Sequence, residues 1–251
     1  MTYCVAIKLS AGLVFCSDSR TNAGIDQVGT YSKMYTWGLR NKRQFVLLSA
    51  GNLATTQAVA NQITKQINER FPINLFTVGD LNEAADYVGK VSAAEQTKYL
   101  NSSAGCGFNP ETTFIFGGQI SGYPQEIFLI YPQGNHIQAS NHAPFLQIGE
   151  TKYGKPILDR IIRADTPIED AASCALVSMD STMRSNVSVG PPVELTVYQN
   201  DSFQLQHRFR LMEEDPFLGD LKRAWDEQIQ KAFREIPKLN LQKFDCERPY
   251  A

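Results

Sequence analysis

Three residue types near the amino terminus could together form an activated nucleophile. Thr2 follows Met1 directly and is small enough for ordinary methionine removal. Removal would leave a free α-amine on the residue that also carries a β-hydroxyl. With a pKa near ~8, that amine is partly unprotonated at neutral pH and can accept the hydroxyl proton. Because a Met-Thr start is common in proteins without such chemistry, the hypothesis depends on residues further along the chain.

Asp18 and Lys33 are the residues that could tune this nucleophile. Asp18 ends a predicted strand over 13–18, and Lys33 follows fifteen residues later, an isolated cation among aromatic and small residues. If this strand pairs with one predicted over 3–8, the amino terminus lies beside Asp18. A lysine near Thr2 disfavours the protonated amine and stabilises alkoxide character. An aspartate beside the lysine would hold it charged and oriented, as in a catalytic triad.

Gly51 is the third element of the candidate site. It ends a predicted strand over 44–50 that runs directly into a predicted helix. A glycine at such a junction lets the backbone approach a ligand closely, and the amides at a helix start are free to donate. This junction is therefore a candidate oxyanion hole for a tetrahedral intermediate.

Other reactive side chains have plainer interpretations. Arg20 is expected to form a structural ion pair, and Glu150 to be a carboxylate at a helix entry. Cys4 and Cys16 are expected to be buried in strands. Cys106 has no identifiable base and is interpreted as a loop residue. The histidines are too scattered for a metal site or a Ser–His pair, so we expect no metal and no organic cofactor: His136, His142, His207.

Composition is typical of a soluble, compact protein. The 251 residues are 43% hydrophobic and 20% charged, and the net charge of -2 argues against nucleic-acid binding or adhesion to an anionic membrane. No apolar run is long enough to span a membrane, and the start lacks the pattern of a signal peptide. The five cysteines are scattered without CxxC spacing, which indicates free thiols and a cytoplasmic location.

Periodicity predicts a single α+β domain over 1–251, with 213–251 as a helical extension. Runs of strands alternate with pairs of helices, and the continuous apolar strands suit two stacked sheets between helical layers. The predicted strands are 3–8, 13–18, 44–50, 112–120, 125–131, 137–140, 193–199 and 203–209. The predicted helices are 53–71, 80–99, 153–163, 167–183 and 215–236.

These residues resemble the proteasome β-subunit family of N-terminal-nucleophile hydrolases. The resemblance is carried by Thr2, the run 18–24, Lys33, and Ala50-Gly51 with Gln57, and more loosely by 183–190. It covers residue 2 to about 200. Within this family, the length, the Thr-Tyr-Cys-Val-Ala start and the C-terminal extension are most similar to the bacterial Anbu, or ancestral β-subunit, group.

The resemblance implies a four-layer αββα sandwich with an extra C-terminal helix, and threonine-type peptide hydrolysis. Thr2 would be the nucleophile and its amine the proton shuttle, Lys33 would lower the pKa of the nucleophile, and Asp18 would hold Lys33. Gly51 would stabilise the oxyanion, and Ser188 matches a serine that the family uses. Residues implied to bind the peptide substrate or shape its specificity pocket are Thr21, Tyr31, Tyr35, Ser49 and Leu53.

The resemblance also implies a homo-oligomeric ring or ring-like assembly, and the sequence does not identify an unfoldase partner. The predicted helix 215–236 has an apolar face that needs a cover, and it is a candidate subunit contact: Leu218, Leu221, Trp225, Phe233.

Two departures from the family pattern leave alternative functions open. Gly149 stands where the family has a serine, unless Glu150 or Thr151 substitutes, and Ser185 stands where it has an aspartate. The alternatives are an amidohydrolase acting on a small amide and a catalytically silent assembly protein.

Overall fold

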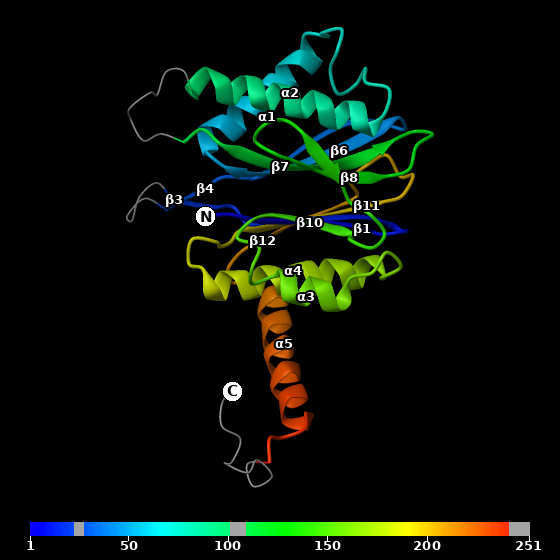
Figure 1. Cartoon of the computed structure of the whole chain (residues 1–251). Helices are drawn as coiled ribbons and strands as arrows, with labels where there is room; N and C mark the ends of the chain where they lie inside the picture. Colours follow the sequence, from blue (N-terminus) through cyan, green and yellow to red (C-terminus); the bar gives the residue numbers. More distant parts are fainter. Residues whose placement is uncertain (23–27, 101–108, 241–251) are drawn as a thin grey trace, which may run out of the picture.

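Two five-stranded antiparallel sheets lie at the centre of the molecule (Figure 1). The computed structural model describes residues 1–22, 28–100 and 109–240. The first sheet has the order β10-β1-β2-β11-β12 and the second the order β5-β6-β7-β8-β9, while β3 and β4 form a separate pair. The strands are β1 (Tyr3–Lys8), β2 (Gly12–Ser17), β3 (Arg20–Asn22), β4 (Val28–Thr30), β5 (Met34–Leu39), β6 (Arg43–Gly51), β7 (Thr112–Ile120), β8 (Glu126–Ile130), β9 (His136–Gln138), β10 (Phe145–Gly149), β11 (Val193–Gln199) and β12 (His207–Leu211).

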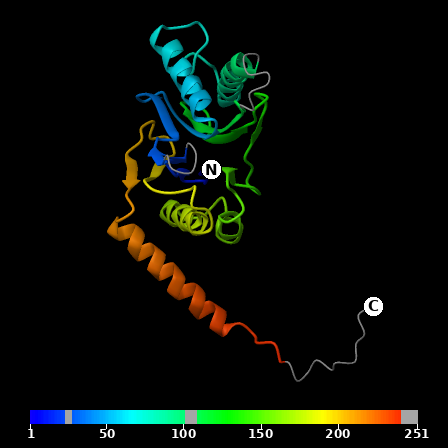
Figure 2. The same ribbon diagram turned by 90° about the vertical axis from the view of Figure 1, so that its left-hand side faces the viewer.

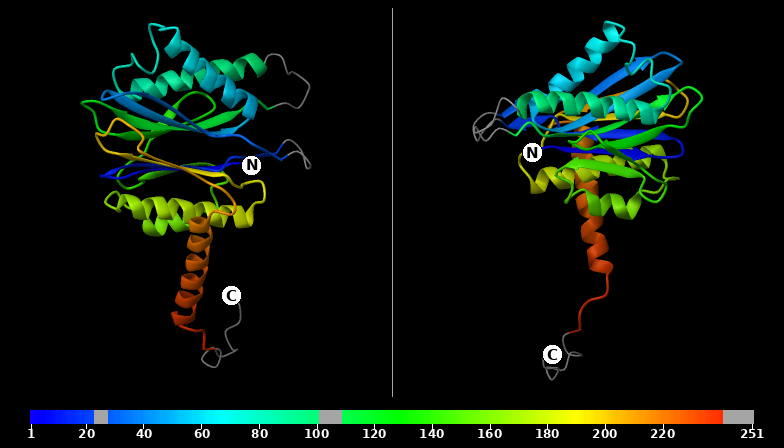
Figure 3. Two further views of the ribbon diagram at one scale, coloured as in Figure 1. Left: turned by 180° about the vertical axis from the view of Figure 1, so that it is seen from behind. Right: turned by 45° about the horizontal axis from the view of Figure 1, so that its top comes forward.

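Helices cover the outer face of each sheet, and the inner faces of the two sheets pack on one another (Figures 1 and 3). The second sheet carries α1 (Leu53–Asn68) and α2 (Leu81–Leu100), and the first carries α3 (Lys155–Ile161) and α4 (Ile168–Ser185). The result is a mixed fold with antiparallel sheets, as the segregated order of the elements predicts. None of the helices in the described ranges is both long and apolar enough to cross a membrane.

The apolar strands are buried on both faces because each sheet is covered twice. In β1, Tyr3, Val5 and Ile7 belong to the core cluster formed with α3 and α4. Cys4 and Ala6, which point the opposite way, belong to the cluster between the two sheets. This double burial explains the continuous apolar runs in the sequence. Cys4 and Cys16 are both fully buried, which confirms their expected positions.

The register of β1 fixes where the chain begins. Cys4 lies opposite Ser17 of β2, and on the other side Tyr3 lies opposite Gly149 of β10. The predicted pairing of the first two strands is therefore confirmed. The amino terminus lies between the two layers of strands, close to the β3–β4 pair (Figure 1).

Several elements differ from the prediction. The strands β3, β4, β5 and β10 were not expected. The last strand, β12, spans His207–Leu211 rather than 203–209. Asp201 and Phe203 have positive φ angles of 59° and 48°, so the chain turns there and cannot extend until later. Gly24 and Cys106 lie outside the described residues.

The last helix, α5 (Pro216–Glu235), projects away from the sheets and their covering helices (Figures 1 and 2). Its first turn is anchored, since Leu218 is buried and Asp215 caps the helix by accepting from Phe217 N. Arg184 of α4 bonds Asp226 of α5 at 2.7 Å. Beyond this attachment the apolar side chains are exposed: Ile229 48%, Phe233 71%, Ile236 52%. Of the expected apolar face, Leu218 is buried, Leu221 and Trp225 are half-buried and Phe233 is exposed, so only the outer part of this face is uncovered in the single chain.

Candidate active site

The main chain of Thr2 is held by the loop that follows β10. Glu150 N donates to Thr2 O at 2.7 Å. Gly149 has φ +83°, and a Cβ on it would lie 2.0 Å from Thr2 O. Only glycine fits that position, because a side chain would be strained and would collide with the Thr2 carbonyl. The position of the candidate nucleophile is thus fixed from one side by backbone contacts.

Asp18 is buried directly beside the start of β1. Its Oδ1 accepts from Tyr3 N at 3.0 Å and from Lys33 Nζ at 2.7 Å, and its Oδ2 accepts from Gly190 N at 3.3 Å. Burial raises the pKa of the Asp18 carboxyl above its ordinary value, and the Lys33 charge and these hydrogen bonds oppose that effect. Asp18 therefore links the residue after Thr2 to Lys33.

Lys33 is 5% exposed, and its ammonium is held by two acceptors. One is Asp18, and the other is the carbonyl of Arg20, which accepts at 2.7 Å. An ammonium has three donors, so one remains for a group in the cleft that Lys33 and Thr2 both line. The predicted arrangement of Thr2, Asp18 and Lys33 is brought together at one end of the two sheets.

A cleft of about 740 Å³ lies over this group. Gly51 ends β6 on its wall with φ +112°, and a Cβ there would lie 2.3 Å from Glu111 O, so the junction requires glycine. Asn52 caps α1 by accepting from Thr55 N. Of the residues predicted to bind substrate, those on the wall are Thr21, Ser49 and Leu53.

Tyr31 and Tyr35 are not on the cleft wall. Tyr31 is 47% exposed, and its amide donates to Ser19 O. Tyr35 is half-buried, and burial raises the pKa of its hydroxyl above its ordinary value. Neither ring closes the cleft.

Ser188 lies in the loop between α4 and β11, outside the cleft wall. Its amide donates to Asn186 Oδ1 at 3.0 Å, and Asn186 Nδ2 donates to Glu150 Oε2 at 3.1 Å. Two residues further on, Gly190 bonds Asp18. The loop thus joins Asp18 to the segment that holds Thr2, while Ser185 is exposed at the end of α4.

Sequence reasoning missed contacts that are made by backbone groups. The amide of Gly190 and the carbonyl of Arg20 carry no signal in the residue type, although the segment around Gly190 was singled out. The expectation for Arg20 was wrong: its Nη1 donates to Val187 O at 2.8 Å, and no carboxylate pairs with it among the described residues. Further wall residues that were not predicted are Asn52, Thr56, Asn109, Glu111 and Thr113.

The described residues contain no cluster of side chains that is typical of a metal site. No group of three or more His, Cys, Asp or Glu side chains there could hold an ion. His136 contacts Asp86 at 3.1 Å, at the surface. The site residues that the structure brings together are a hydroxyl, a carboxylate, an ammonium and backbone amides.

Three solved structures are similar to almost the whole chain. An Anbu Gly-1 mutant from Hyphomicrobium sp. strain MC1 is 42% identical with a TM-score of 0.89, over 96% of this chain and 100% of that one. Anbu from Yersinia bercovieri is 41% identical with a TM-score of 0.89, over 95% and 99%. The helical assembly of the Anbu complex from Pseudomonas aeruginosa is 43% identical with a TM-score of 0.91, over 96% and 100%. No protein-family model and no curated protein matches the chain.

The fold and the site define a proteasome-related β-subunit. At more than 40% identity over nearly complete chains, the likeness to these three structures exceeds what a shared fold alone requires. The chain belongs to the Anbu, or ancestral β-subunit, family.

Proposed function

We propose that the chain is a threonine-type peptidase whose nucleophile is the Thr2 hydroxyl, exposed by removal of Met1. The observation that carries the proposal is the buried contact of 2.7 Å between Lys33 Nζ and Asp18 Oδ1. Asp18 also accepts from the amide of Tyr3, the residue after Thr2. The ion pair is therefore tied to the backbone next to the nucleophile. A structural ion pair would have no need to border a cleft.

The proposed reaction begins when Thr2 Oγ attacks a peptide carbonyl and its proton passes to the Thr2 amine. Lys33 stabilises negative charge on the attacking oxygen, and the Gly51 amide donates to the oxyanion. The C–N bond then breaks, and the Thr2 ammonium protonates the leaving amine, which leaves an ester on Thr2. Water attacks this ester and the amine takes up a proton from the water. The bond between the acyl carbon and Thr2 Oγ then breaks, the ammonium returns the proton to Oγ, and the carboxylic acid product leaves.

An extended peptide suits the cleft better than a small amide does. Thr21 of β3 and Gly51 of β6 come from separate strands, and both line the cleft. Their backbone groups are proposed to pair with the peptide on either side, and Ser49 and Leu53 to contact a substrate side chain. Tyr31 and Tyr35 do not close the cleft, as a pocket for a small amide would require. Ser188 is proposed to position the loop that binds Asp18.

We also propose that the chain works as part of a homo-oligomer. The relative from Pseudomonas aeruginosa forms a helical assembly, and the exposed apolar side chains of α5 need a cover. The residues 213–251 are proposed as an extension that supplies this contact. The remaining chain is proposed as one domain of the four-layer αββα type found in N-terminal-nucleophile hydrolases, which the helix–sheet–sheet–helix order supports (Figure 1).

A cleavage assay with three forms of the protein tests the proposed activity. Chains shown by intact mass to lack Met1 are incubated with a panel of fluorogenic peptides. Wild type is expected to cleave at least one peptide, Thr2→Ser to keep part of the rate because it keeps a hydroxyl, and Thr2→Ala to lose it. Equal rates in wild type and Thr2→Ala would rule out Thr2 as the nucleophile. Hydrolysis of small amides alone would support the amidohydrolase alternative.

A further inference from the structure

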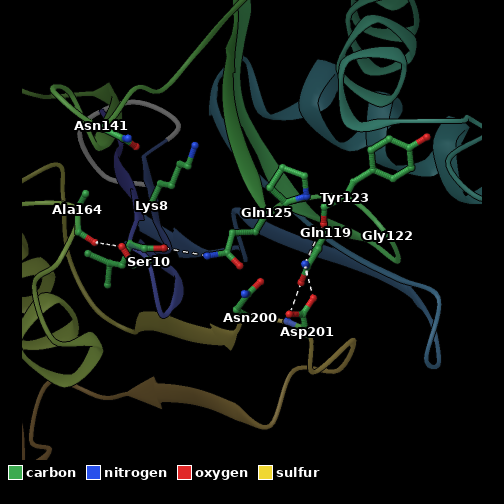
Figure 4. Close-up of a pocket in the computed structure, with 12 residues that line it drawn as sticks. Lys8, Ser10, Gln119, Gly122, Tyr123, Gln125, Asn141, Ala164, Asn200 and Asp201 are labelled. Atoms are coloured by element: carbon green, nitrogen blue, oxygen red, sulfur yellow. Dashed lines mark hydrogen bonds between the residues drawn. The ribbon is translucent and has the colours of Figure 1, made fainter.

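A second pocket lies at the opposite end of β1 from Thr2 (Figure 4). It has a volume of about 440 Å³ and is lined by Lys8, which ends β1, and by residues from the β7–β8 turn and the end of β11. A strand rises about 3.3 Å per residue, so this distal pocket is roughly 20 Å from the candidate nucleophile. It shares no lining residue with the cleft over Thr2.

Gln125 carries the argument for a ligand. Its side chain is 6% exposed, and Nε2 donates to Leu9 O at 2.8 Å. That bond fixes the orientation of the amide, because the reverse orientation would set two acceptors against each other. Its Oε1 is buried and has no donor among the residues that the structure describes. In Figure 4 this oxygen faces the side of the pocket where Asn200 and Asp201 lie. Buried acceptors are ordinarily paired, so this one calls for a donor.

On the side of the pocket toward Asp201, the polar side chains are held by hydrogen bonds to one another. Gln119 is 2% exposed and uses both ends of its amide. Its Oε1 accepts from Tyr198 Oη at 2.6 Å and from Asp201 N at 2.8 Å, while Nε2 donates to Asp201 Oδ1 at 2.7 Å. The Asp201 carboxylate is thus held at the pocket before any ligand arrives, which lowers the entropic cost of binding.

The unpaired charge of the distal pocket is negative. Its two charged lining residues are Lys8 and Asp201. Lys8 is neutralised by Glu126 at 2.6 Å. Asp201 has no cationic partner in the described part of the chain. A bound group that offers N–H donors and a positive charge would satisfy Gln125 Oε1 and balance Asp201.

We propose that the distal pocket binds a small polar molecule through a primary ammonium group. The ammonium donates to Gln125 Oε1 and lies beside the Asp201 carboxylate. The polar side chains of Asn141 and Asn200 are available to the rest of the molecule. An anion is disfavoured, since it would meet an acceptor oxygen and an unpaired carboxylate.

Calorimetric titration of the full chain with ethanolammonium chloride tests this proposal. Saturable binding is expected in wild type. Asp201→Asn is expected to weaken it at least tenfold, and this variant keeps the acceptor for Gln119 and tolerates the positive φ of 59° at that position. Gln125→Leu is expected to weaken it similarly. Glu214→Gln, which removes an exposed carboxylate outside the pocket, is the matched control and is expected to bind as wild type does.

A crystal of the protein soaked in ethanolammonium supplies the second measurement. Density for the amine within hydrogen-bond distance of Gln125 Oε1 supports the proposal. The proposal is overturned if no saturable binding occurs, if Asp201→Asn and Gln125→Leu bind as wild type does, or if the crystal shows only an ordered water there. Preferential binding of acetate or phosphate would overturn it as well.

Discussion

At the scale of single residues, the site depends on a charge pair that is almost removed from solvent. Asp18 is fully buried and Lys33 is 5% exposed. A buried pair of this kind costs desolvation energy, so it is weak evidence of a role in stability alone. Lys33 lines the cleft beside Thr2 and Asp18 binds the amide of the next residue, and this position is the basis for proposing that the pair serves catalysis.

Replacing Lys33 is expected to destabilise the fold in a pH-dependent way. In Lys33→Met, Asp18 keeps a buried negative charge without a partner, and the free energy of unfolding at pH 7 should fall by about 3–5 kcal/mol. Burial already raises the pKa of Asp18, and loss of the lysine raises it further. A carboxyl whose folded-state pKa is raised contributes stability below its unfolded pKa near ~3.9, and this stability is lost as pH rises through the folded-state pKa. The difference in the free energy of unfolding between Lys33→Met and wild type should therefore become smaller as the pH falls toward 4.

Urea unfolding of both proteins at pH 4, 5.5 and 7 measures this difference. Lys155→Met is the control, because it breaks an exposed pair with Asp159 and should cost about 0–1 kcal/mol. If Lys33→Met lowers the free energy of unfolding by the same amount at all three pH values, an unpaired charge on Asp18 is not the cause of the loss.

At the scale of elements, the site is built where strands end. Thr2 precedes β1, Asp18 follows β2, and Gly51 ends β6. The candidate nucleophile is held by one loop, after β10, that passes within hydrogen-bond distance of its carbonyl. A small displacement of that loop should therefore move Thr2 and change the rate of the proposed reaction.

Gly149→Ala is expected to reduce peptidase activity at least tenfold, because its Cβ would displace the Thr2 carbonyl. Gly122→Ala is the matched control: its φ of +88° is similar, but a Cβ there meets nothing within 4 Å. Both variants should lose about 1 kcal/mol or more of stability from backbone strain. Activity against fluorogenic peptides and thermal unfolding separate the two effects. Equal activity in both variants would show that the contact with Thr2 is unimportant.

The sequence predicted the long, buried elements well and the short ones poorly. The strand β11, Val193–Gln199, begins and ends where predicted, since its apolar run is bounded by turn residues. β10 was missed because Phe145–Gly149 is only five residues long, too short for its pattern to stand out. β5 was missed because its aromatic residues were interpreted as the surroundings of Lys33. Strands of this kind are specified by their partners in the sheet, which a single sequence does not reveal.

The site was predictable where the chemistry needs a particular side chain. Thr2, Asp18 and Lys33 could be found because only a few residue types provide a hydroxyl, a carboxylate or an ammonium. Gly190 could not be assigned its role, since every residue type except proline offers a backbone amide. The placement of Tyr31 outside the cleft depends on the course of β3 and β4, which no periodicity indicated.

At the scale of the whole molecule, α5 is the part least explained by a single chain. It is attached by the buried Leu218 and by an ion pair with α4, and its outer half exposes apolar side chains. Ile229→Glu with Phe233→Glu should shift the protein toward smaller species, because charges would then face the proposed subunit contact. Light scattering coupled to size-exclusion chromatography measures the shift. Gln230→Glu adds a charge to an exposed polar position of the same helix and should leave the mass unchanged. An unchanged mass in the double variant would exclude this face as the contact.

The most direct test of the central claim is covalent labelling of the nucleophile. Protein that has lost Met1 is incubated with an epoxyketone or a β-lactone directed at N-terminal nucleophiles, and adducts are located by mass spectrometry. The account predicts one adduct on Thr2 in wild type, much slower labelling in Lys33→Met, and no adduct in Thr2→Ala. Absence of an adduct on Thr2 in wild type, or an adduct that persists in Thr2→Ala, would contradict the proposal that Thr2 is the nucleophile.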